Sequence, residues 1–254
     1  MTTLAAPGAT LTYDVTGRGP VLLLVPGGPA DAAVFTAIRP QLAEDHTVVT
    51  FDPRGLGRSP LDGEPTGDTI REHAEDVHRL LTEVGPADVF ANSGGAITML
   101  DHVVRHPGDV RTVVLHEPPV TRYAPAGALD GPDIPALFRD QGLAPAFAAF
   151  MTTLGIDPAP PLDPRAEGNF AYFFGRLMPA TGAYDPDLDA LRATSARLVV
   201  AVGEKSGGQL AHETGLGLAA DLDLKPELFP GDHGGFIAEP DAFAARLREV
   251  LEGR

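Results

Sequence analysis

The sequence Ala-Asn-Ser-Gly-Gly at 91–95 places Ser93 between small neighbours. An apolar run at 87–91 precedes it, and apolar residues at helical spacing follow over 96–106. This order predicts a strand that turns sharply into a helix and holds Ser93 in a strained conformation that only small neighbours tolerate. The serine oxygen then lies at a helix N-terminus, where the helix dipole favours developing negative charge. We therefore interpret Ser93 as a nucleophile rather than as a plain helix N-cap.

A serine hydroxyl is a poor nucleophile until a base removes its proton, and His233 is the candidate base. It lies in Gly-Asp-His-Gly at 231–234, between the last predicted strand and the last predicted helix. The chain contains eight histidines, so one histidine near a strand end is unremarkable by itself. Its place after Ser93 in the chain and its flanking glycines favour a catalytic role over the stabilisation of a surface turn.

The sequence predicts a mostly parallel sheet covered by helices on both faces, because short aliphatic runs alternate with helical patterns. The runs 11–15 and 21–25 look like an antiparallel hairpin at the sheet edge, since a turn containing Gly and Pro separates them. The predicted strands are 11–15, 21–25, 47–51, 87–91, 111–116, 197–202 and 227–229, and the predicted helices between and after them include 70–84, 96–106 and 240–251.

Residues 118–196 break this alternation. Roughly 80 residues pass there without a convincing strand, far more than a normal crossover loop holds. Helical stretches are predicted around 134–154, 166–177 and 187–191, and six of the twelve phenylalanines lie in the segment. We therefore expect a core domain made of 1–117 and 197–254, with a helical cap inserted at 118–196.

The chain resembles the α/β-hydrolase family over essentially its full length. Pro-Gly-Gly-Pro at 26–29 is similar to the family's His-Gly-x-Pro oxyanion loop, with Pro26 in place of the histidine. Asp-Pro-Arg-Gly-Leu-Gly-Arg-Ser at 52–59 resembles the family's Asp-x-x-Gly-x-Gly-x-Ser turn. The serine motif fits the family's nucleophile elbow with Ala91 replacing the first glycine, and His233 stands where the family keeps its catalytic histidine.

The resemblance implies an α/β-hydrolase fold with an oxyanion hole formed by the backbone N–H groups of Gly28 and Gly94. For Gly28 the alternative is a simple tight turn. Asp52, Arg54 and Ser59 are expected to lock loops through hydrogen bonds and ion pairs rather than to take part in the reaction.

The acid of the triad has two candidates. The family usually places it a few residues beyond the strand 197–202, but Ser206 occupies that position and Glu204 is the carboxylate nearby. The family's other place is just after the preceding strand, where Glu117 stands. Zearalenone lactonases and one branch of haloalkane dehalogenases resemble this arrangement. The resemblance implies that Glu117 orients His233; the alternatives are Glu204 as the acid and a capping role for Glu117 at the entrance to the inserted segment.

Composition limits the partners. Nineteen Lys and Arg against 35 Asp and Glu give a formal net charge of −16, which argues against nucleic acids and anionic membranes. The chain has no cysteine, so disulfides, thiol chemistry and cysteine-based metal sites are excluded. No secretory signal is visible, and the longest aliphatic stretch, 21–25, is too short to span a bilayer. We expect a cytoplasmic protein with a small-molecule substrate.

Other chemistries lack their residues. Ser93 is not an aspartate, so carboxylate attack of the dehalogenase or epoxide-hydrolase kind is not supported. No Gly-x-Gly-x-x-Gly follows a strand and no phosphate loop is present, so no cofactor is expected. His102 and His106 have the i,i+4 spacing of metal ligands, but the glutamate of zinc proteases is missing between them. We interpret them as a solvated helix face and expect no metal.

Together these features predict a serine hydrolase that cleaves a carboxylic ester or lactone through an acyl-enzyme. An aminopeptidase of the proline iminopeptidase type is one alternative: its Gly-Gly-Pro loop resembles 27–29, although Pro26 and Ala30 replace that family's flanking His and Gly. A non-catalytic binding protein that keeps the fold is another. The phenylalanines of the cap predict an apolar or aromatic substrate, unless they form only the cap's own core. The candidate substrate-binding residues are Phe138, Phe147, Phe150, Phe173 and Phe174.

Overall fold

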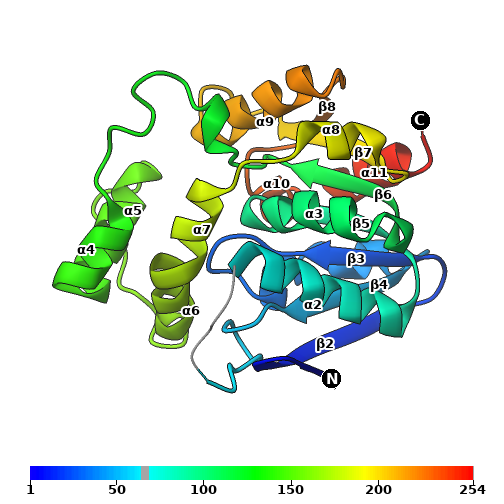
Figure 1. Cartoon of the computed structure of the whole chain (residues 1–254), viewed down its shortest axis with the longest axis horizontal. Helices are drawn as coiled ribbons and strands as arrows, with labels where there is room; N and C mark the ends of the chain where they lie inside the picture. The colour runs from blue at the N-terminus through cyan, green and yellow to red at the C-terminus, as the bar shows by residue number, and fades with distance from the viewer. Residues whose placement is uncertain (64–68, 254) are drawn as a thin grey trace.

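The computed structural model describes residues 1–63 and 69–253, so Arg254, the last residue of the predicted core domain, lies outside the described residues. One sheet runs through the molecule in the strand order β1-β2-β4-β3-β5-β6-β7-β8 (Figure 1). β1 and β2 are antiparallel to their neighbours, and β3 to β8 are parallel to one another. The strands are β1 (Thr2–Ala6), β2 (Ala9–Gly17), β3 (Val21–Val25), β4 (Thr47–Asp52), β5 (Ala87–Asn92), β6 (Val110–His116), β7 (Arg197–Gly203) and β8 (Glu227–Phe229).

The predicted hairpin between 11–15 and 21–25 is wrong. β2 pairs antiparallel with β1 and β4, whereas β3 lies between β4 and β5 as a parallel strand. The residues at 22–24 in β3 are fully buried, which is typical of a central strand covered by helices on both faces. β1 was not predicted because it is a mostly exposed edge strand without an apolar run.

Helices cover both faces of the sheet, as predicted. One hydrophobic cluster joins the sheet to α2, α3, α8 and α9, and a second joins the opposite face to α1, α10, α11 and the helical turn η1. Their bounds are η1 (Ala32–Phe35), α1 (Arg39–Leu42), α2 (Thr69–Val84), α3 (Gly94–Arg105), α8 (Leu188–Ala193), α9 (Leu210–Asp221), α10 (Gly235–Ala238) and α11 (Pro240–Leu251). Two shorter turns flank β6, namely η2 (Pro107–Asp109) and η3 (Thr121–Tyr123).

The chain between β6 and β7 is helical and carries a hydrophobic cluster of its own. Its helices are α4 (Ile134–Gln141), α5 (Leu143–Thr153), α6 (Glu167–Tyr172), the π-helical turn η4 (Phe173–Leu177) and α7 (Met178–Ala183). α4, α5 and α6 lie to one side of the sheet (Figure 1). They bury residues such as Phe147 and Phe174 together with Leu56, which follows β4. Val120 and Leu191, near the two ends of the segment, pack instead in the cluster that joins the sheet to α2, α3, α8 and α9.

Within the described part of the chain, no helix combines the length and the apolar character that crossing a membrane requires.

Candidate active site

Ser93 occupies the sharp turn between β5 and α3. Its φ of 53° and ψ of −123° are costly for a non-glycine residue, on the order of 1–3 kcal/mol, and persist only where the surroundings enforce them. A Cβ on Gly95 would come within 2.6 Å of the carbonyl oxygens of residues 25 and 26, and one on Gly27 would come within 2.3 Å of the Asn92 carbonyl oxygen. The turn therefore packs directly on the loop after β3, and glycine is required on both sides of this contact.

Gly28 and Gly94 line one cavity beside this turn. A Cβ on Gly94 would lie 3.3 Å from the Gly28 nitrogen, so the two backbones are close neighbours. Within 1–63 and 69–253, neither N–H group donates a hydrogen bond. The Gly94 N–H has no helical partner because it lies at the first position of α3. Both N–H groups are therefore available as donors to an oxygen atom that gains negative charge.

Glu117 directly follows β6 and is fully buried, with 0% of its surface exposed and a φ of 50°. Its Oε2 accepts a hydrogen bond from His233 Nδ1 at 2.6 Å. Its Oε1 accepts one from the Gly203 N–H at 2.9 Å and another from the Ser206 hydroxyl. Burial alone would raise the pKa of Glu117, but these hydrogen bonds outweigh it and lower the pKa to about 2. The carboxylate is thus ionised at neutral pH and keeps the proton of His233 on Nδ1, which leaves Nε2 as a base.

The carboxylate that contacts His233 belongs to Glu117 and not to Glu204. Glu204 is exposed, and in the described structure it makes no hydrogen bond to His233. Its backbone N–H bonds the Phe229 carbonyl at 2.9 Å, so the chain there still follows β8. Ser206, at the usual position of the acid, donates to Glu117 instead. Sequence analysis did not assign Ser206 a role, although its occupation of the acid position was a signal.

Ser93 follows β5 and His233 follows β8, so both residues lie beyond the carboxyl ends of parallel strands. The Asn92 side-chain amide donates to the His233 carbonyl at 3.3 Å, and the Ser93 N–H donates to the His116 carbonyl at 2.9 Å. Among the described residues, no hydrogen bond joins the Ser93 hydroxyl to the His233 ring. Such bonds are often long in a free enzyme and shorten when substrate binds.

The cavity beside the two glycines is shallow, and the empty space of about 300 Å³ at its mouth includes open solvent. Leu56, Phe173 and Leu177 supply apolar walls. His73, which sequence analysis missed, also lines it; its Nε2 lies 3.3 Å from the Tyr172 hydroxyl. Burial and the Arg54 charge lower the pKa of His73 to about 3, so the cavity wall holds a neutral imidazole. The sequence contains little indication of this role, because a histidine on the buried face of a helix looks like an ordinary core residue.

The five candidate phenylalanines divide into two groups. Phe173 lines the cavity and lies 4.0 Å from a Cβ built on Gly28. The others pack among the inserted helices with ring centroids 4.9–6.3 Å from neighbouring rings, and they are Phe138, Phe147, Phe150 and Phe174.

The loop residues make the kind of contacts expected of them. The Asp52 carboxylate accepts hydrogen bonds from the N–H groups of Ala32 and Arg58 at 3.1 and 2.7 Å. Arg54 forms a buried pair with Asp76 through two hydrogen bonds of 2.7 Å. The Ser59 hydroxyl donates to the Asp52 carbonyl at 2.6 Å. These contacts fix the turn after β4, whose Leu56 reaches the cavity.

The interpretation of 102–106 as a solvated helix face is wrong for His102. This residue is fully buried, and its Nδ1 lies 3.1 Å from the Ala74 carbonyl oxygen of α2. The reason is helix packing. Residue 102 follows the buried Met99 by three positions and Thr98 by four, so it continues the stripe that α3 turns toward α2.

Comparisons with known proteins identify the family of the chain. Residues 20–177 match the family model of the alpha/beta hydrolase fold. The chain is 32% identical over 258 residues to an uncharacterized hydrolase of Bacillus subtilis (strain 168), YraK, with 98% of this chain and 95% of that protein covered. It is 25% identical to a zearalenone hydrolase of Bionectria ochroleuca, with 98% and 97% covered. A solved α/β hydrolase from Sphaerobacter thermophilus DSM 20745 matches with a TM-score of 0.74 at 23% identity, covering 98% of this chain and all of that one. These matches confirm the predicted family: the chain is a hydrolase and belongs to the α/β-hydrolase fold family.

Proposed function

We propose that this hydrolase cleaves a carboxylic ester or lactone of an apolar or aromatic small molecule through an acyl-enzyme on Ser93. The observation that supports it most is the 2.6 Å hydrogen bond between His233 Nδ1 and the buried, ionised Glu117. Glu117 follows β6 directly, and β6 pairs with β5 so that Asn92 faces His116. Ser93 and Glu117 therefore follow adjacent strands at their carboxyl ends, and the hydrogen bond to Glu117 holds the His233 ring at the same end of the sheet.

In this mechanism the Ser93 oxygen attacks the substrate carbonyl carbon while His233 Nε2 accepts its proton. The oxyanion that forms accepts hydrogen bonds from the N–H groups of Gly28 and Gly94. Glu117 stabilises the imidazolium, which then passes its proton to the leaving alkoxide. Water, deprotonated by His233, attacks the acyl-enzyme and releases the acid with Ser93 restored. In a lactone the alkoxide and the acid belong to one product molecule.

The cavity favours an apolar substrate over a free amino terminus. An aminopeptidase needs a carboxylate that binds the substrate's ammonium group. The described residues that line the cavity include no Asp or Glu, and the imidazole of His73 is neutral there. This observation favours ester or lactone cleavage over the iminopeptidase alternative. The zearalenone hydrolase among the relatives makes zearalenone a natural member of a substrate panel.

Covalent labelling tests the serine mechanism and separates it from a non-catalytic binding protein. A fluorophosphonate probe is expected to add one adduct per chain, located on Ser93 by peptide mass spectrometry. Ser93→Ala should abolish both the adduct and ester hydrolysis. The matched control is Ser195→Ala. It removes an exposed hydroxyl outside the candidate site and should change neither the labelling nor the rate of hydrolysis. An adduct on another residue, or normal turnover by Ser93→Ala, would overturn the proposal.

A further inference from the structure

The buried carboxylate of Glu117 is held by two groups besides His233, and one of them has a further partner of its own. Oε1 accepts hydrogen bonds from the Gly203 N–H and from the Ser206 hydroxyl. The Ser206 oxygen is fully buried and lies 3.0 Å from Nδ1 of His212, a partly buried residue in the first turn of α9. One continuous chain of hydrogen bonds therefore runs from His212 to His233.

The contacts of this chain fix where its protons lie. The Ser206 hydroxyl has one proton to donate and two lone pairs that accept. Its possible acceptors are Glu117 Oε1, the Gly203 carbonyl at 3.0 Å and His212 Nδ1. The ionised carboxylate is the strongest of these, because charge-assisted hydrogen bonds are about twice as strong as neutral ones. The hydroxyl proton therefore points to Glu117, and His212 carries a proton on Nδ1 that it donates to the Ser206 oxygen.

Glu117 needs these donors because its carboxylate can rotate. The last torsion of a glutamate side chain is broad, so a single hydrogen bond to His233 would leave the plane of the carboxylate poorly defined. Two donors on Oε1 fix this plane and so keep Oε2 on His233 Nδ1. A hydroxyl that also accepts an N–H bond is polarised and donates more strongly. His212 therefore strengthens the contact through which Ser206 holds the acid.

The N-terminal half of α9 packs against the acid, which holds His212 in place. The Thr214 hydroxyl donates to the Pro118 carbonyl at 3.0 Å. A Cβ on Gly215 would lie 3.7 Å from the Cα of Glu117 and 3.6 Å from Pro118. α9 therefore contacts the chain directly at the residue with positive φ that carries the acid.

We propose that Ser206 and His212 are positioning residues of the hydrolytic reaction. They fix the plane of the Glu117 carboxylate and so keep its second oxygen on His233 Nδ1. Neither residue lines the cavity beside the catalytic turn, so both act through Glu117 rather than on the substrate. This role rests on the proposed function, because the orientation of the imidazole matters for hydrolysis only where His233 is the base.

Hydrolysis of 4-nitrophenyl acetate tests this role. Ser206→Ala should lower kcat about 10- to 100-fold at nearly constant KM, because a misplacement of about 1 Å can cost 10²-fold in rate. His212→Leu and His212→Asn are a matched pair of the same shape, and only asparagine keeps an N–H donor near the position of Nδ1. The leucine variant should lose about tenfold in kcat, and the asparagine variant should stay within about threefold of wild type.

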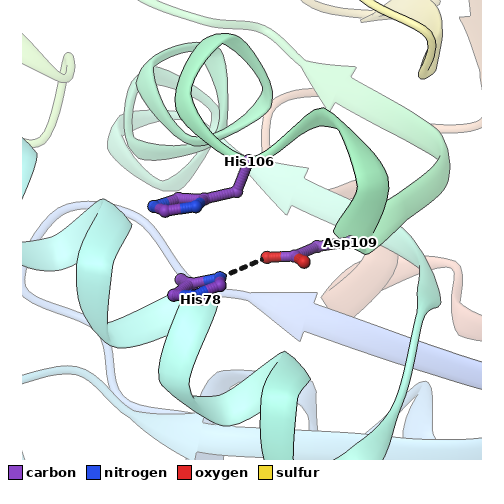
Figure 2. Close-up of side chains that lie close together, drawn as sticks. All are labelled: His78, His106 and Asp109. Atoms are coloured by element: carbon purple, nitrogen blue, oxygen red, sulfur yellow. Dashed lines mark hydrogen bonds and ion pairs between the residues drawn. The ribbon is translucent and has the colours of Figure 1, made fainter.

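A double-mutant cycle separates positioning from general destabilisation. Because His212 acts through Ser206, adding His212→Leu to Ser206→Ala should lower kcat no further, whereas two independent losses would multiply. The matched control is His78, whose Nδ1 pairs with Asp109 at 2.7 Å (Figure 2). Asp109 follows α3 at the end of that helix that is remote from Ser93. His78→Leu and His78→Asn should both leave kcat unchanged.

The proton between His233 Nδ1 and Glu117 gives a second readout, by nuclear magnetic resonance, that needs no substrate. A proton in a charge-assisted hydrogen bond resonates far downfield, and His233→Asn assigns the signal by removing it. Ser206→Ala and His212→Leu should move the signal upfield and broaden it, because the carboxylate no longer faces the ring; His212→Asn should not. A downfield move would mean that the hydroxyl only withdraws charge from Glu117, and it would overturn the proposal.

Glu117→Gln distinguishes a wrong positioning role from a wrong catalytic mechanism. Turnover that collapses in Glu117→Gln but stays near wild type in Ser206→Ala and His212→Leu would overturn the positioning role alone. Normal turnover in Ser93→Ala or Glu117→Gln would overturn the proposed function, and the proton signal would still show whether the donors orient His233. Should Ser206→Ala not fold, the His212 pair decides: equal kcat in the leucine and asparagine variants would overturn the positioning role.

Discussion

Two non-glycine residues with positive φ stand at the ends of neighbouring strands, Ser93 after β5 and Glu117 after β6. Backbone strain of this kind concentrates at functional sites, where surrounding contacts hold a side chain in a direction that relaxed backbone would not give it. At Ser93 the contact with the loop after β3 holds the turn. At Glu117 both carboxylate oxygens are hydrogen-bonded to other segments of the chain.

Because Ser93 is strained, we expect its replacement by glycine to raise stability and to remove activity. Ser93→Gly should raise the free energy of unfolding by about 1 kcal/mol, because glycine adopts positive φ without steric cost, and it should abolish hydrolysis. Urea unfolding of the two proteins measures the difference. The control Ser195→Gly changes an exposed serine whose φ is not positive and should leave stability unchanged or slightly lower. If both variants lose stability equally, the Ser93 conformation is not strained.

At the scale of elements, the inserted helices contain two phenylalanines with different surroundings in the same turn, η4. Phe173 lines the cavity, whereas Phe174 is fully buried among the helices. Phe173→Ala should lower kcat/KM for apolar substrates about tenfold relative to small esters, because apolar contact with the substrate is lost. Phe174→Ala should lower the free energy of unfolding by about 3–5 kcal/mol without changing the order of substrate preference. Kinetics over a graded ester series and urea unfolding check the two effects, and an equal change of preference in both variants would contradict the assignment.

The elements that sequence could predict are those with strong local patterns. The parallel strands appeared as aliphatic runs, and the turn at Ser93 was visible because a strand, small residues and a helix follow in order. Which strands pair with one another was harder to predict from the sequence. β2 and β3 are neighbours in sequence and separated in the sheet by β4, because β3 is buried on both faces and needs parallel partners. Likewise the burial of His102 depends on how α2 packs on α3, a property of two helices that neither sequence segment contains alone.

The site could be predicted as far as its residues have fixed places in the chain. Ser93 and His233 each follow an identifiable strand, so their common place at the carboxyl end of the sheet follows from the parallel arrangement of these strands. The contacts of Ser206 with Glu117 and of Tyr172 with His73 join residues 89 and 99 positions apart. Such distant pairs need the folded structure. Which phenylalanine lines the cavity depends on which face η4 turns toward it, and no local sequence pattern distinguishes Phe173 from Phe174.

At the scale of the whole molecule, buried histidines make stability sensitive to mild acid. Burial lowers the pKa of His73 to about 3 and the pKa values of His102 and His116 to about 4, against the usual 6.5. Between pH 6.5 and about 4 these histidines bind protons in the unfolded chain but stay neutral in the folded chain. The stability from these groups is therefore complete above pH 6.5 and decreases as pH falls below it. Glu117 adds a second loss, from about pH 4.5 toward its folded pKa near 2.

Urea unfolding at pH 7.5 and pH 5, with a chelator present to exclude metals, measures the first loss. One pKa unit is worth about 1.4 kcal/mol, so a single unit on each of three rings would already remove about 4 kcal/mol. The free energy of unfolding should therefore be lower at pH 5 by several kcal/mol. An equal or higher value at pH 5 would mean that these rings are protonated in the folded chain.

The central claim is that a Ser-His-Glu triad at the carboxyl edge of the sheet performs the hydrolysis, and the acid is its most discriminating member. The direct measurement is turnover of Glu117→Gln against Glu204→Gln, on the best substrate of the ester and lactone panel, with folding of both variants verified. Loss of the acid that orients the imidazole should lower kcat on the order of 10⁴-fold in Glu117→Gln. Glu204→Gln, which removes an exposed carboxylate, should stay near wild type. Collapse of turnover in Glu204→Gln with near-normal turnover in Glu117→Gln would contradict the account.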